Sequence, residues 1–165
     1  QGLDQRAADR DALSAGLADG TIDALVSDHN PVADDMKTLP FGEAEPGATG
    51  LELLLSLALR WGQDRGLSPA QAWSTVTHRP VAVLGDAVGS LAHSAGRLVE
   101  GGVADLCLAD VEVQWAVTPA QLASQGKHTP FSFDSTGMAL PGRVRATFVA
   151  GTLAFGDPGL FGPSA

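Results

Sequence analysis

Hydrophobic positions recur at helical spacing in two stretches of the chain. In residues 6–19, Leu13 and Leu17 lie four positions apart with alanines between them, and Gly20 follows. The second stretch, 50–62, places apolar side chains at i, i+3, i+4 and i+7: Leu51, Leu54, Leu55, Ala58 and Trp61. This spacing predicts one helix that ends at Gly20 and a second that packs against neighbours on two sides.

Between these helices the pattern changes to that of a strand and then a loop. Thr21–Ser27 is almost continuously apolar, which is typical of a strand buried on both faces, and the run ends at Asp28. Residues 29–49 are rich in proline, glycine and acidic residues. A loop of this length inside a domain is usually functional or disordered. Asp34–Lys37 could form one helical turn within it.

Capping patterns mark three further helix starts. Ser68-Pro-Ala-Gln71 combines a capping serine, a proline at the first helical position and a glutamine that can complete a capping box. Residues 79–84 follow with Pro80 near their start and a glycine after their end. Thr118-Pro-Ala-Gln121 repeats the first pattern and predicts a helix that ends near Gly126.

After residue 89, segments of strand type alternate with glycine turns. The candidate strands cover 105–108, 111–117, 144–149 and 152–155. We therefore expect an α/β part over residues 1–88, a mostly β part over 89–156, and a Gly/Pro-rich tail over 157–165.

Composition narrows the class of protein. The 165 residues suit one domain or one lobe with an appendage, and the hydrophobic fraction of 44% is typical of a globular chain. The net charge of −9 argues against a nucleic-acid partner. No apolar run reaches transmembrane length, so we expect no membrane partner and a cytoplasmic protein. Cys107 is the only cysteine, and we expect it to be a small buried strand residue. Because the chain starts with Gln1, it could be an internal piece of a longer protein.

Asp28 is the leading candidate for chemistry. It follows an apolar strand, where α/β barrels carry their catalytic groups, so it could be a metal ligand or a general base. Spacing alone favours a structural role, because an Asp can cap a turn through its own backbone. His29 faces the other side of a continuing strand, so we expect it to orient the loop or bond a backbone carbonyl. His78, His93 and His128 show no metal-binding spacing.

Several motifs resemble a known enzyme family. The order Ser27-Asp-His-Asn-Pro31, Lys37, Pro40-Phe-Gly42 and Pro46-Gly-Ala-Thr-Gly-Leu-Glu52 resembles the last-strand segment of class I dihydroorotases. The stretch from Gly96 to Leu106 resembles the tail signature of the wider amidohydrolase superfamily. Two later segments are similar to the dihydroorotase C-terminus: 124–131, and 141–144 together with Gly151.

The resemblance implies a fold. A dihydroorotase is a metal-dependent (β/α)₈ barrel with a small β-sandwich beside it. Residues 1–88 would form the end of the barrel, with its eighth strand at about 21–28, the active-site loop at 29–49 and a helix at 50–62. Residues 89–156 would be the C-terminal share of the sandwich. The strand at 21–27 would then pair with another chain or another part of the fold, since bare strand edges are liabilities.

The resemblance also implies a reaction. Dihydroorotases reversibly interconvert N-carbamoyl-L-aspartate and L-dihydroorotate in pyrimidine biosynthesis, with zinc polarising the amide carbonyl and acidifying the attacking water. The metal-binding, proton-shuttling Asp of the family corresponds to Asp28, and its substrate contacts correspond to Phe41 and Gly42. The other ligands would lie upstream of residue 1. Because a catalytic zinc needs about three protein ligands, we expect this chain alone to be inactive.

Two departures keep other functions open. The second His of the family turn, a partner of the substrate carboxylate, is Val32 here, and valine cannot donate a hydrogen bond. The loop before Phe41 is also about five residues shorter than in the family, within the range of tolerated loop changes. One alternative is a non-catalytic dihydroorotase-like scaffold, with aspartate carbamoyltransferase as its partner in an oligomer. Another is a free-standing acidic α/β binding module.

Overall fold

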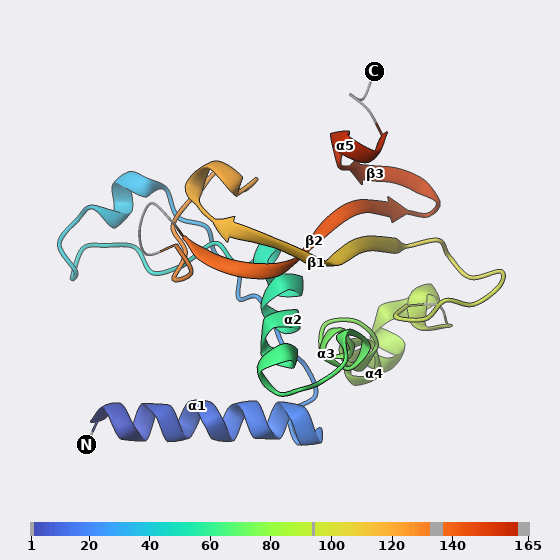
Figure 1. Cartoon of the computed structure of the whole chain (residues 1–165), viewed down its shortest axis with the longest axis horizontal. Helices are drawn as coiled ribbons and strands as arrows, with labels where there is room; N and C mark the ends of the chain where they lie inside the picture. Colours follow the sequence, from blue (N-terminus) through green and yellow to red (C-terminus); the bar gives the residue numbers. More distant parts are fainter. Residues whose placement is uncertain (1, 94, 133–136, 162–165) are drawn as a thin grey trace. The chain divides into compact units, whose positions relative to one another are not determined.

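A computed structural model describes residues 2–93, 95–132 and 137–161. The chain forms two compact units, each assembled from separate stretches of sequence. The first unit contains Gln1–Leu25 and Trp61–Val103, and the second contains Val26–Arg60 and Ala104–Ala165. Figure 1 shows the elements in sequence colours. The domain boundary expected near residue 88, between the barrel part and the sandwich part, concerns the complete protein and stays a prediction.

The first unit begins with helix α1, Gly2–Asp19, which is longer than the helix predicted from Leu13 and Leu17. Its end is as expected, because Gly20 adopts a left-handed φ of 89°. The Asp19 carboxylate accepts a hydrogen bond from the Thr21 amide at 2.9 Å. This bond lowers the pKa of Asp19 below its usual value. The carboxylate therefore stabilises the turn that follows the helix.

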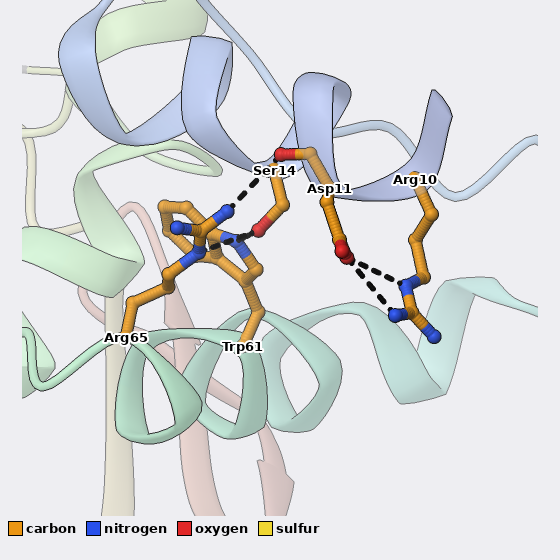
Figure 2. Close-up of polar contacts among 5 residues, drawn as sticks. All are labelled: Arg10, Asp11, Ser14, Trp61 and Arg65. Atoms are coloured by element: carbon orange, nitrogen blue, oxygen red, sulfur yellow. Dashed lines mark hydrogen bonds and ion pairs between the residues drawn. The ribbon is translucent and has the colours of Figure 1, made fainter. Parts of the chain in front are cut away.

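Ser14 connects α1 to the part of helix α2 (Leu54–Asp64) that lies in the same unit (Figure 2). The hydroxyl oxygen of Ser14 accepts hydrogen bonds from Trp61 Nε1 and from Arg65 Nε, both at 2.8 Å. The guanidinium of Arg65 also donates to the backbone oxygen of Asp11 at 3.2 Å. One small side chain thus satisfies two donors that would otherwise need water.

Helix α3 confirms the predicted capping box, and α4 confirms the predicted short helix, although no side chain caps its start. In α3, Pro69–Ser74, the Ser68 hydroxyl accepts from the Gln71 amide at 3.3 Å, and the Ser68 amide donates to Gln71 Oε1 at 3.0 Å. Helix α4, His78–Leu84, ends at Gly85, whose φ is 52°. A 3₁₀ stretch follows over Gly85–His93 and is kinked at Gly89.

The strand predicted over 21–28 is not formed. A strand requires a ladder of hydrogen bonds to a neighbour, and this segment makes only isolated ones. Leu25 donates its amide to Thr75 O at 3.0 Å, and Asn30 donates to Ala48 O at 3.1 Å. Burial on both faces also fails, because Val26 is 76% exposed. Among the described residues, no strand lies alongside this segment to complete a ladder.

In the second unit the long loop contains the expected helical turn, a 3₁₀ turn at Asp34–Lys37. A further 3₁₀ turn at Leu51–Leu53 leads directly into α2. The helix predicted over 50–62 is therefore present, with a tighter first turn and a later end. Of the predicted apolar positions, Ala58 is fully buried, whereas Leu51 is 61% exposed. Leu53 and Leu59, outside that spacing, are the other buried hydrophobic residues here.

Three antiparallel strands form the sheet of this unit, in the order β1-β2-β3 within the described part of the chain. They are β1 (Leu106–Val117), β2 (Met138–Val149) and β3 (Thr152–Gly156). Trp115 pairs with Leu140 across β1 and β2. The register between β1 and β2 shifts twice in the stretch from Leu108 to Gln114. The sequence predicted two separate strands here, 105–108 and 111–117. A short helix α5, Pro158–Phe161, lies within the predicted tail.

The core of the second unit lies where α2 and its 3₁₀ turn meet β1 and β2. Its buried members are Leu53, Val117, Leu122 and Leu140. Gly142 allows close contact on β2, because a Cβ there would lie 2.8 Å from Leu59 Cδ2. The Gly142 carbonyl accepts from Ser56 Oγ at 2.8 Å and from Trp115 Nε1 at 2.9 Å. The helix is thus bonded as well as packed against the sheet.

The prediction of a helix from Thr118 to near Gly126 is wrong. The structure has only a 3₁₀ turn at Pro119–Gln121, and the Thr118 side chain makes no capping bond. The following amides, of Ala123 and Ser124, donate to the carboxylate of Glu52 instead. A distant side chain therefore satisfies the groups that a helix would have used. No described helix is long and apolar enough to cross a bilayer.

Candidate functional site

Asp28 lies in an exposed loop and has an unusual backbone conformation. Its φ is 44°, in the left-handed region that residues other than Gly, Asn and Asp seldom adopt. Within the described ranges its carboxylate has no hydrogen bond or ion pair, so it does not cap the turn through its own backbone. The backbone of Asp28 therefore has a turn conformation, and its carboxylate is exposed.

His29 anchors this loop. Its Nδ1 accepts hydrogen bonds from the amides of Gly50 at 3.1 Å and Leu51 at 3.2 Å. A ring nitrogen that accepts carries no proton, so these contacts assign the neutral ring's proton to Nε2. The orienting role expected from the sequence is confirmed, although the partners are amides rather than a carbonyl.

Two glycines let the segment 47–50 approach the Asp28 loop closely. A Cβ on Gly50 would lie 2.6 Å from the carbonyl oxygen of Ser27. A Cβ on Gly47 would collide with the carbonyl oxygen of Asn30, and its φ of 135° also excludes an ordinary side chain. These contacts give the reason for both glycines.

Thr49 and Glu52 bind the same segment to residues 123–128. The Thr49 amide donates to His128 O at 2.8 Å, and its buried hydroxyl donates to Gly126 O at 2.5 Å. The carboxylate of Glu52 accepts from the amides of Ala123 at 2.7 Å and Ser124 at 3.0 Å. The sequence analysis did not predict either role. The one indication in the sequence is that Thr49 and Glu52 are polar residues next to the apolar positions at which a helix begins.

The expected substrate-binding residues lie at the tip of the loop. Lys37 closes its base by donating to the carbonyl oxygens of Glu45 at 2.5 Å and Gly47 at 2.8 Å. Phe41, beyond this closure, is 100% exposed, and no atom lies within 4 Å of a Cβ placed on Gly42. No contact of either residue with Asp28 is present in the described chain. The structure therefore leaves the three predicted residues separate.

Val32 is a core residue. It is 6% exposed, and its Cγ2 would lie 3.0 Å from a Cβ on Gly47. Its carbonyl oxygen would lie 2.7 Å from a Cβ on Gly126. The side chain that replaces the family's second histidine is thus buried against Gly47, and the backbone of Val32 lies close to Gly126.

The described residues do not form a metal site by themselves. No group of three or more His, Cys, Asp or Glu side chains that could hold a metal ion is found among them. A catalytic zinc takes about three protein ligands, and Asp28 would supply one. The residues present therefore do not fit a complete zinc centre.

Cys107 lies on β1 as predicted, but it is exposed rather than buried. Partial desolvation raises the pKa of its thiol, and a side-chain hydrogen bond with Thr147 opposes this rise. A raised pKa disfavours the thiolate, so the side chain lacks the activation that a nucleophilic cysteine needs.

The chain is similar in sequence to dihydroorotases and dihydroorotase-like proteins. It is 37% identical to the dihydroorotase of Citrifermentans bemidjiense over 149 residues, which cover 90% of the chain and 32% of that protein. It is 39% identical to a dihydroorotase-like protein of Pseudomonas putida over 150 residues, 91% of the chain and 32% of that protein. The chain therefore spans about a third of the length of the curated relatives it matches. No protein-family model matches it.

Solved structures of hydantoinases share its fold. The D-hydantoinase (dihydropyrimidinase) of a Thermus species superposes with a TM-score of 0.73 and 22% identity, over 89% of the chain and 31% of that structure. The L-hydantoinase of Arthrobacter aurescens gives a TM-score of 0.71 and 28% identity, over 87% of the chain and 31% of that structure. These likenesses, with helices and strands in both partners, confirm the α/β content expected from the sequence.

Proposed function

Because the chain is a relative of the dihydroorotases along nine-tenths of its length, we propose that it is part of a cyclic amide hydrolase. The reaction would be the interconversion of N-carbamoyl-L-aspartate and L-dihydroorotate. The sequence match to dihydroorotase over 149 residues carries this proposal. The contacts of His29, Gly47, Gly50 and Glu52 support it, because they give a structural role to most of the family motif.

The proposed fold of the complete protein is a (β/α)₈ barrel with a β-sandwich. In it, residues 21–28 would form the eighth strand once a neighbouring strand supplies the ladder that the segment lacks here. Residues 89–156 would belong to the sandwich. The three antiparallel strands of the second unit are compatible with this assignment.

Asp28 is the proposed catalytic residue of this part of the enzyme. An exposed carboxylate on a turn that His29 anchors can serve as a metal ligand and hold a proton. Phe41 and Gly42 are proposed to contact the substrate through the loop tip. Zinc is the proposed cofactor of the complete protein, and its remaining ligands would come from outside this chain. The chain alone is therefore expected to show no turnover.

A chimaeric enzyme tests the proposal. This chain would replace the 149 matched residues in the dihydroorotase of Citrifermentans bemidjiense, and dihydroorotate hydrolysis would be measured. We expect activity in the chimaera and its loss, by about 10³-fold or more, in an Asp28→Asn variant. Asp35→Asn is the matched control, because Asp35 is an exposed acid of the same loop whose carboxylate accepts only from the next amide. A folded chimaera whose activity is unchanged by Asp28→Asn would refute the role of Asp28.

The scaffold function has one observation in its favour, the burial of Val32 where the family has a substrate-binding histidine. The same chimaera separates the two functions. A folded but inactive chimaera that co-purifies with aspartate carbamoyltransferase would support the scaffold, whereas turnover would exclude it. The sequence similarity to proteins named dihydroorotase favours the enzyme. The free-standing module is disfavoured because the fold matches one third of a larger hydrolase.

A further inference from the structure

A pocket of about 250 Å³ lies beside the 3₁₀ turn Asp34–Lys37 in the second unit. Its polar lining comes from that turn and from the segment 127–132: Asp34, Lys37, Lys127, His128, Thr129 and Ser132. Drug-sized ligands occupy pockets of about 300–1,000 Å³, so this one suits a smaller molecule. Asp28, Phe41 and Gly42 are not part of the lining. The proposed reaction therefore gives the pocket no role.

Positive charge is concentrated in this lining. The chain contains two lysines, Lys37 and Lys127, and both line the pocket. Their ammonium groups bond only neutral carbonyl oxygens in the described structure, Glu45 O and Gly47 O for Lys37 and Leu122 O for Lys127. Because an ammonium group has three N–H donors, Lys37 keeps one free and Lys127 keeps two. Neither ammonium group forms an ion pair with a described residue.

Thr129 adds a second, independent signal. The residue is 4% exposed, and its hydroxyl oxygen is buried without a hydrogen-bond partner among the described residues. Buried hydroxyl groups almost always have a partner, because an unpaired one keeps the full cost of its desolvation. A ligand in the pocket that accepts a hydrogen bond would remove this cost.

The negative charge of Asp34 does not cancel the two lysines. Its Oδ1 accepts from the backbone amide of Lys127 at 3.2 Å, so it is partly satisfied by the protein itself. Asp34 is also the one carboxylate among the described lining residues. Two cations face one anion, and the lining keeps a net positive charge in a chain whose total is −9.

We propose that this pocket binds a small oxyanion, a carboxylate or phosphate group, between Lys37, Lys127 and the hydroxyl of Thr129. The free ammonium donors and the unpaired hydroxyl are the groups that carboxylate and phosphate oxygens accept from. Asp34 would then accept from an O–H or N–H group elsewhere on the same molecule. The site would be a second ligand position in addition to the Asp28 turn.

Selective labelling makes the test direct. With ¹³C-labelled lysine, the intact 165-residue chain gives two ε-methylene signals, one for each lysine of the pocket. Inorganic phosphate and succinate are titrated separately at constant ionic strength, with chloride as the reference. We expect both signals to shift together and saturate, with a dissociation constant of about 1 mM or tighter. Saturation by phosphate alone assigns a phosphate group, and saturation by succinate alone assigns a carboxylate. Saturation by neither overturns the proposal.

Two variants locate the binding. Thr129→Val keeps the shape of the side chain and removes the unpaired hydroxyl, and Lys127→Met removes one charge. Each should weaken binding about tenfold or more, while Thr129→Val leaves the unfolding midpoint unchanged or higher. The matched controls are Thr152→Val on exposed β3 and Arg97→Met, which lie outside the pocket. If the controls weaken binding as much as the pocket variants do, the shifts report general charge and the proposal fails.

Discussion

The carboxylate of Glu52 accepts a hydrogen bond from the backbone amide of Ala123 at 2.7 Å, across 71 residues of sequence. Its second oxygen accepts from the next amide, of Ser124, at 3.0 Å. One side chain in the 3₁₀ turn before α2 thus holds the segment that leads towards the lysine pocket. The motif residues around Glu52 consequently act on two loops, that of Asp28 and that of Lys127.

Removing this carboxylate should destabilise the second unit. In Glu52→Ala the amides of Ala123 and Ser124 lose a charged acceptor, so we expect the free energy of unfolding to fall by about 2 kcal/mol. Urea unfolding followed by tryptophan fluorescence measures the loss. Glu43→Ala is the control, because Glu43 is an exposed acid of the long loop. Equal stability of the two variants would show that the Glu52 bonds contribute nothing.

Gly50 should tolerate no side chain. In Gly50→Ala the new Cβ would lie 2.6 Å from Ser27 O, so the Asp28 turn must move, at a cost of about 1–3 kcal/mol. Gly42→Ala adds the same methyl group where no atom lies within 4 Å, and its effect should stay within about 0.5 kcal/mol. Thermal unfolding of both variants compares the two positions. A neutral Gly50→Ala would mean that the turn is not held as the structure shows.

Restoring the family's histidine should be costly here. Because Val32 is 6% exposed and lies against Gly47 and Gly126, Val32→His places a polar ring in a filled space and should cost about 1–3 kcal/mol. Val26→His, at a position that is 76% exposed, should be nearly neutral. Urea midpoints of the two variants decide the point. An unaffected Val32→His would indicate that this position can turn outwards to a substrate.

The hydroxyl of Ser14 should matter more than its size suggests. Ser14→Ala leaves Trp61 Nε1 and Arg65 Nε without their common acceptor, and we expect a loss of about 1–2 kcal/mol (Figure 2). Leu13→Ala removes more atoms from the adjacent position, yet Leu13 is 62% exposed and should matter less. Denaturant unfolding measures the loss of stability in each variant. A larger loss in Leu13→Ala than in Ser14→Ala would show that Leu13, rather than the Ser14 hydroxyl, holds α1 in place.

Asp157 should make the free energy of unfolding depend on pH in the acidic range. Its pKa is lowered by the hydrogen bond from the Gly159 amide and by the ion pair with Arg145 at 2.6 Å. The ionised form is therefore favoured in the folded state. This contribution is complete above the unfolded pKa of about 3.9 and is lost as the pH falls through the lower folded value.

Asp157→Asn removes that dependence. The variant should be less stable than the parent chain at pH 7, and the difference should shrink as the pH falls below about 4. Urea midpoints measured from neutral to acidic pH give both quantities. A difference that stays constant over the whole range would show that the charge of Asp157 is not the cause.

Local sequence was sufficient to predict structure wherever residues close in the chain form each other's hydrogen bonds. Ser68 and Gln71 form the predicted capping box because both partners lie within one helical turn. The identical spacing at Thr118 and Gln121 fails, since the amides that follow bond to Glu52. The candidate site divides in the same way: the motif around Asp28 was recognisable, whereas its anchoring by His29 depends on the amides of Gly50 and Leu51.

Sequence alone thus determined the helices with complete local signals, the acidic composition and the kinship with cyclic amide hydrolases. Tertiary structure decided where the long-range bonds fall: that residues 21–28 form no ladder, that Val32 is buried, and that Lys37 and Lys127 line one pocket. The physical reason is the range of the interactions. Capping and periodicity act within a few residues, whereas a carboxylate or an ammonium group bonds whatever the folded chain brings within about 3 Å of it.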